Sequence, residues 1–138
     1  MTALEALDTI VKAGVRIIPG PDRPRLGVPS TVREQVKPLV HAHREELRRL
    51  IGEHSRILEA AYRAFWSLPE TSGAETFSTA YREIALLETR IAPDISWWTL
   101  RASATAYHAE TGICPFCRER GPLHLLAEQV EMEFQNGK

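Results

Sequence analysis

Residues 19–24 restrict the fold of this chain most, because they read Pro-Gly-Pro-Asp-Arg-Pro. Three prolines within six residues exclude a helix there. Short apolar stretches with a strand-like pattern lie on both sides. Val15 and Ile17 come before the prolines, and residues 26–28 follow them. We therefore predict a small β-hairpin that turns at residues 19–24.

An amphipathic helix is predicted on each side of this hairpin. Residues 2–13 place apolar side chains on one face, and Gly14 ends that helix. The second helix begins at Ser30 or Thr31, because Thr31 and Glu34 have capping-box spacing. Its apolar stripe consists of Val32, Val36, Leu39, Val40, His43, Leu47, Leu50 and Ile51. A unit this small buries little core alone, so we expect it to pair with a second copy or with a partner.

Three segments of this N-terminal unit resemble the TubC-type N-terminal docking domain. They are residues 2–7 (Thr-Ala-Leu-Glu-Ala-Leu), residues 12–17 (Lys-Ala-Gly-Val-Arg-Ile) and residues 40–51 (Val-His-Ala-His-Arg-Glu-Glu-Leu-Arg-Arg-Leu-Ile). The resemblance covers residues 1–54. It implies an α-β-β-α fold, a homodimer, and a role on assembly-line synthetases, where such domains recognise a short linear tail of the upstream protein.

The predicted hairpin carries a local excess of positive charge. Arg16, Arg23 and Arg25 all lie on it, and Asp22 is the only acidic residue between Arg16 and Arg33. One interpretation is a solvated turn. The other is a basic surface beside an open strand edge, which suits a short acidic segment of a protein partner. On this second interpretation the partner-binding residues are Arg16, Ile17, Ile18, Arg23 and Arg25.

Residues 55–138 are predicted to form an all-helical domain. Gly52 is expected to stop or bend the preceding helix. Further helices are expected at residues 55–68, 74–92 and 95–107, the last of them capped by Asp94, followed by a short one from residue 123 or 125 to 134. Trp66, Trp97 and Trp98 could form a stacking platform, but packing of at least one adjacent tryptophan into the core is the better interpretation.

Four residues near the C-terminus have the spacing of a metal site. His108, Cys114, Cys117 and His124 follow the pattern His-x5-Cys-x2-Cys-x6-His. Two thiolates and two imidazoles suit a structural zinc ion, and we predict a zinc knuckle here. An ordinary pair of thiols is one alternative. Redox chemistry is the other, which we reject because residues 118–122 leave too short a helix after the cysteines and no βαβ pattern is present.

Composition and charge exclude several classes of protein. The net charge is −1, so there is no general electrostatic case for nucleic-acid binding. No apolar run is long enough to span a membrane and no secretory signal is visible, so we expect a cytoplasmic protein. No phosphate-binding loop, nucleophile elbow or His-Glu-x-x-His helix occurs. We predict a non-enzymatic docking adaptor, with a small zinc-knuckle accessory protein for nucleic acids as the alternative.

Overall fold

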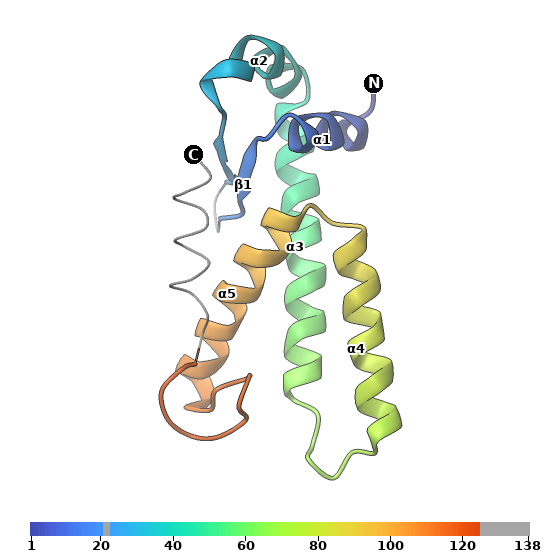
Figure 1. Ribbon diagram of the computed structural model, residues 1–138, viewed down its shortest axis with the longest axis vertical. Coiled ribbons are helices and arrows are strands. Elements are labelled where there is room, and N and C mark those ends of the chain that lie inside the picture. The colour runs from blue at the N-terminus through green and yellow to red at the C-terminus, as the bar shows by residue number, and fades with distance from the viewer. Residues whose placement is uncertain (21–22, 125–138) are drawn as a thin grey trace.

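The computed structural model describes residues 1–20 and 23–124 and is mainly helical, with a two-stranded antiparallel sheet near the N-terminus (Figure 1). This confirms the predicted fold class. The elements are α1 (Ala3–Lys12), β1 (Arg16–Ile18), β2 (Arg25–Gly27), a 3-10 turn η1 (Ser30–Val32), α2 (Arg33–Ala42), α3 (Arg44–Trp66), α4 (Ala74–Thr89) and α5 (Pro93–Thr111). The last helix expected, which would end at residue 134, lies outside the described residues.

Helix α1 and the hairpin follow the predicted pattern closely. Thr2 and Glu5 form a reciprocal capping box, in which Glu5 N–H donates to Thr2 Oγ1 over 3.2 Å and Thr2 N–H donates to Glu5 Oε1 over 3.3 Å. The backbone N–H and the hydroxyl of Thr2 both donate to the Glu5 carboxylate, and they hold the pKa of Glu5 below its usual value. Gly14, with φ of 94°, turns the chain out of the helix into β1. In the hairpin Arg16 pairs with Gly27, Ile17 with Leu26 and Ile18 with Arg25.

The helices after the hairpin break at a different place from the one expected. Residues 30–32 form a 3-10 turn, so α2 begins at Arg33 and the Thr31–Glu34 capping box does not form. The chain then bends at His43, and α3 runs without interruption through Gly52. Apolar periodicity continues on both sides of His43, so it could not reveal the bend. The roughly 1 kcal/mol that one glycine costs is outweighed in a 23-residue helix packed along its length.

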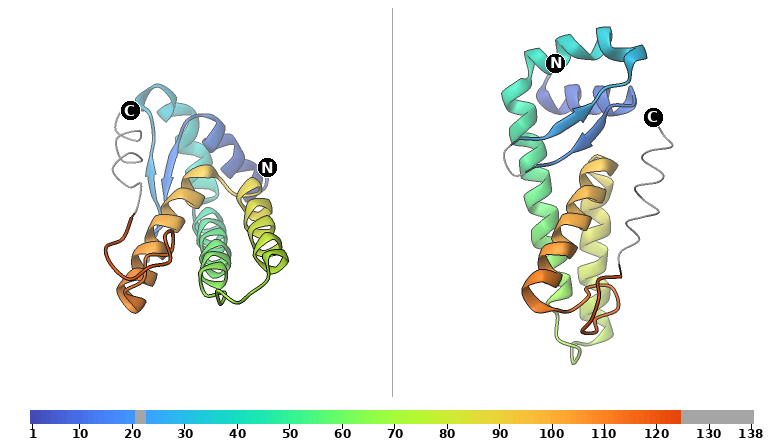
Figure 2. Two further views of the ribbon diagram at one scale, coloured as in Figure 1. Left: turned by 60° about the horizontal axis from the view of Figure 1, so that its bottom comes forward. Right: turned by 90° about the vertical axis from the view of Figure 1, so that its left-hand side faces the viewer.

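Helix α3 is the central element of the fold. It packs against both α4 and α5, and Figure 1 and the left view of Figure 2 show these two helices on opposite sides of its C-terminal half. Helix α1 and the hairpin lie beside its N-terminal half (Figure 1). The boundary expected at residue 54 therefore lies within this helix, and the core continues past it. The buried core residues include Leu7, Ile10, Ile17, Val36, Leu47, Ile51, Leu58, Tyr62, Trp66, Ile84 and Ile95.

Polar contacts between α3 and α5 add to this packing. Ser55 Oγ and Thr99 Oγ1 lie 2.9 Å apart, and Arg63 forms a two-pronged ion pair with Glu110, with distances of 3.0 and 3.3 Å. Asp94, expected to cap α5, makes no cap hydrogen bond, since the helix begins at Pro93. Its carboxylate instead accepts a hydrogen bond from the hairpin, described below.

The tryptophans separate into two environments. Trp66 is in the core and stacks on Tyr62 with ring centroids 5.8 Å apart. Trp97 and Trp98 are only half-buried, and the guanidinium of Arg101 lies 5.3 Å from the ring centroid of Trp98. The prediction that one of the adjacent pair enters the core was therefore wrong, because α5 buries a stripe of small residues, such as Ser96 and Thr99, against α3.

Candidate functional site

Within the described part of the chain, the β1 edge of the hairpin is closed and the β2 edge is open. On the closed side, the backbone N–H of Ile17 in β1 donates to Oδ2 of Asp94 over 3.0 Å. In an antiparallel strand the N–H and C=O of one residue point to the same side, so both groups of Ile17 point away from β2. Its partner Leu26 belongs to the same non-hydrogen-bonded pair. Leu26 therefore directs its own N–H and C=O away from β1, towards the open edge of β2.

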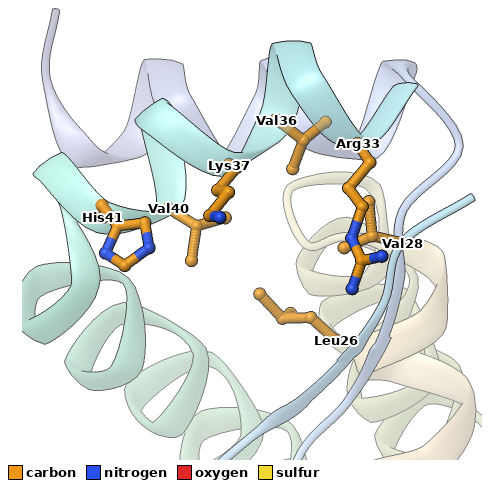
Figure 3. A pocket seen from close by; sticks show the side chains of 7 residues that line it. All are labelled: Leu26, Val28, Arg33, Val36, Lys37, Val40 and His41. Carbon is orange, nitrogen blue, oxygen red and sulfur yellow. The ribbon is translucent and has the colours of Figure 1, made fainter. Parts of the chain in front are cut away.

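This open edge faces a cavity of about 520 Å³ between β2 and α2. In Figure 3, Leu26 points into the cavity from β2 and Val40 from α2, with Val28 and Val36 beside them. Arg33, Lys37 and His41 lie along the α2 side. The cavity therefore combines an aliphatic floor with a positively charged rim.

A second cavity of about 460 Å³ continues the first one, because both are lined by Leu26 and Val40. The other residues lining it are Arg23, Pro24, Arg25, Arg44, Leu47, Arg48 and Ile51. We call the two cavities together the β2 groove. Among the described residues that line it, six are arginine or lysine and none is acidic. This excess of cationic side chains favours an anionic partner.

The structure brings only part of the predicted partner-binding set to this groove. Arg23 and Arg25 line it. Arg16, Ile17 and Ile18 lie on β1, and Ile17 is fully buried with its N–H bonded to Asp94, so it is not accessible to a partner. The predicted residues on β1 therefore lie away from the groove, because nothing local to a hairpin tells which edge another helix will cover.

Sequence reasoning also missed the contribution of α2 and α3 to the groove. In the sequence, Arg44 and Arg48 are interleaved with Glu45 and Glu46, a pattern typical of a solvated, salt-bridged helix face. Arg48 does lie 3.8 Å from Glu45, but both arginines line the groove. A signal was present, since Arg33, Lys37, Arg44 and Arg48 are spaced by four, seven and four residues, which keeps them on one helical face.

Three of the four predicted metal residues, Cys114, Cys117 and His124, lie in a compact loop after α5. Helix α5 ends at Gly112, which has a left-handed conformation with φ of 71°. Ile113 then pairs with Arg120 in an isolated antiparallel bridge, and within that loop Arg118 N–H donates to the carbonyl of Cys114 over 2.8 Å. The donor atoms of Cys114, Cys117 and His124 all lie within 4.8 Å of one another. We call the loop of residues 112–124 the knuckle.

The knuckle also favours the thiolate form of Cys114. Burial raises the pKa of this thiol, but the backbone N–H groups of Cys117, His124 and Phe116 donate hydrogen bonds to it and lower the pKa overall. The donor–acceptor distance from His124 N to Cys114 Sγ is 3.4 Å. Amides directed at sulfur stabilise negative charge before any metal binds. Two sulfurs and one imidazole can therefore hold a metal ion that prefers soft ligands.

His108 does not join this group, although the spacing predicted it as a ligand. Its Nε2 lies 2.6 Å from the carbonyl oxygen of Gly121. The prediction could not be exact here, because His108 lies in the last turn of α5 and the direction of its side chain depends on where that helix ends.

Two side chains anchor the knuckle to the helices. The ring of Phe116 meets Trp66 edge to face with centroids 6.2 Å apart. Arg118 donates to the carbonyl of Leu68, and its guanidinium lies 5.1 Å from the ring centroid of Phe77. The knuckle thus closes the end of the bundle where α3 connects to α4.

Comparison with protein-family models, curated proteins and solved structures finds no match to this chain. Within residues 1–20 and 23–124, no helix combines the length and apolar character that crossing a bilayer requires.

Proposed function

We propose that this chain is a non-enzymatic docking protein that binds a short acidic segment of a protein partner in the β2 groove. The observation that carries the proposal is the open edge of β2. There Leu26 presents its backbone groups beside an aliphatic cavity whose rim carries arginine and lysine without acidic residues among the described lining. A segment added as a third strand would hydrogen-bond to Leu26 and alternate apolar and acidic side chains.

The composition of the groove favours a peptide over nucleic acid. Proteins that bind single strands without sequence preference combine positive charge with aromatic side chains on which the bases stack. The floor here is Leu26, Val28, Val36, Val40, Leu47 and Ile51, all of them aliphatic. Such a floor fits alternate apolar side chains of an extended chain.

The setting follows the resemblance noted in the sequence. A TubC-type docking module over residues 1–54 would act as a homodimer in the cytoplasm and receive a tail from another protein. Helices α4 and α5 then complete the core beneath the module, and the interaction surface stays on the hairpin, α2 and the start of α3. An assembly-line context is part of this proposal.

A binding assay with designed peptides tests the docking function. The probe is a fluorescein-labelled octapeptide that alternates Val or Leu with Glu. The control peptide has Lys in place of each Glu. We expect the acidic probe alone to bind, with an affinity that falls as salt rises to about 1 M. N-methylation of single backbone nitrogens of the probe should abolish binding at alternate positions only. The reason is that the N–H groups on only one side of the added strand pair with β2.

Matched variants locate the binding site. Arg25→Glu with Arg44→Glu should weaken binding about tenfold or more, since both side chains line the groove. Arg56→Glu with Arg82→Glu changes the charge equally at exposed positions away from it. Equal binding by both double variants would refute the proposal. Binding of an oligothymidine probe that the groove variants alone abolish, with no binding of the peptide, would replace it by the nucleic-acid alternative.

For the knuckle we propose a structural zinc ion held by Cys114, Cys117 and His124. The carrying observation is that their donor atoms converge within 4.8 Å while backbone amides favour a thiolate at Cys114. A fourth donor completes the tetrahedron. Protein from a zinc-supplied host should contain about one zinc per chain. Metal analysis without zinc, together with freely reactive thiols in the folded protein, would refute this assignment.

A further inference from the structure

The contact between His108 and Gly121 shows which ring nitrogen of that histidine carries a hydrogen. A carbonyl oxygen can only accept, so Nε2 of His108 carries the proton across the 2.6 Å to Gly121. The lone pair that would bind a metal through Nε2 is therefore absent. His108 also lies outside the group of side chains whose donor atoms converge. His108 nevertheless contacts the knuckle at Gly121, which suggests a role other than that of a metal ligand.

Gly121 is held through both of its backbone polar groups. Its carbonyl accepts from His108, and its N–H donates to the carbonyl of Gly112 over 3.3 Å. Its φ of 140° is one that other residues rarely adopt. Both partners belong to the C-terminal end of α5, so Gly121 is fixed to that helix.

The chain from Gly121 to His124 is short and partly rigid. Only Pro122 and Leu123 intervene, and the ring of Pro122 restricts its φ to about −65°. The N–H of His124 then donates to Cys114 Sγ over 3.4 Å. The direction in which the chain leaves Gly121 thus determines where the His124 imidazole lies relative to the two sulfurs.

We propose that His108 is a positioning residue of the metal site, which orients His124 by holding the carbonyl of Gly121. This inference rests on the metal binding proposed above. A hydrogen bond from outside the ligand set restricts the approach of a ligand before the metal arrives. Loss of such a group weakens metal binding without changing which atoms coordinate.

Cobalt(II) and zinc(II) binding to the full chain tests this role with three variants. His108→Ala removes the donor, His108→Gln retains an amide N–H that can reach the same carbonyl, and His124→Ala removes a ligand. Cobalt absorption bands report the coordinating atoms, and competition with a chromophoric chelator gives the Kd for zinc. Circular dichroism establishes that each variant is folded.

We expect His108→Ala to keep the cobalt bands of the wild type and to bind zinc about 10- to 100-fold more weakly, with most of the loss restored in His108→Gln. His124→Ala should change the bands. Cobalt bands of His108→Ala that match those of His124→Ala would make His108 a ligand and overturn the proposal, as would an unchanged zinc Kd. If His108→Ala does not fold, His108→Leu, which also lacks a donor but fills more of the space, replaces it with the same two readouts. A wild-type chain that binds neither metal would refute the metal site itself.

Discussion

The backbone N–H of Ile17 donates to the carboxylate of Asp94 over 3.0 Å, which joins two residues 77 positions apart. This hydrogen bond attaches β1 to the first turn of α5 and satisfies a backbone group that a two-stranded sheet leaves unpaired. Because it closes the β1 edge, the open edge among residues 1–20 and 23–124 is that of β2. A partly buried contact thereby decides which strand can receive a partner.

Removing this carboxylate should destabilise the whole chain. We expect Asp94→Ala to lower the free energy of unfolding by about 1–3 kcal/mol, because the N–H of fully buried Ile17 loses a charged acceptor. Asp94→Asn retains a carbonyl oxygen and should lose less. Urea denaturation followed by circular dichroism measures both. An Asp94→Ala chain as stable as the wild type would show that water replaces the carboxylate without cost.

Self-association through residues 1–54 has a surface candidate in α1. Leu4 is 58% exposed, whereas Leu7 on the same helix is buried. We expect the full chain to be a dimer in sedimentation experiments at micromolar concentration, and Leu4→Glu to make it monomeric, since a charge replaces an apolar contact. Lys12→Glu, at the other end of α1, is the matched control. A monomeric wild type would mean that packing against α3 and α5 is sufficient to bury the apolar side chains of residues 1–54.

The lowered pKa of His54 should make the stability of the chain depend on pH. Burial lowers the pKa of this imidazole, and the nearby Glu53 opposes that effect only in part. The unfolded chain therefore takes up the proton first, so stability falls as pH decreases below the unfolded value of about 6.5. Thermal melts between about pH 7.5 and 5 bracket the pKa of an unfolded histidine. In this range His54→Gln should make the melting temperature less dependent on pH. His41→Gln keeps the contribution of His54 and serves as the control.

Removing metal should loosen the end of the bundle where the knuckle packs. We expect a chelator or Cys114→Ser to increase amide hydrogen exchange in residues 107–124, because a metal there substitutes for a core that short segments lack. Phe116 and Arg118 link the knuckle to Trp66, Leu68 and Phe77. Exchange in α1 is the internal reference and should not change. Equal protection with and without chelator would contradict a structural role.

Local elements whose causes are local could be predicted from the sequence. The prolines of residues 19–24 required a turn, Gly14 marked the end of the first helix, and apolar periodicity identified the long helices. Cys114, Cys117 and His124 were recognised from spacing alone, since a Cys-x2-Cys turn converges over a few residues whatever the rest of the chain does.

Features that depend on residues distant in sequence became apparent only in the folded chain. Whether β1 or β2 stays open depends on Asp94, and the β2 groove exists because α2 and α3 lie across from Leu26. Likewise, His108 turns to Gly121 because of where α5 ends. The physical reason is the same in each case. Periodicity and capping act within one or two helical turns, whereas the direction of a side chain and the exposure of a strand edge depend on which distant element packs against them.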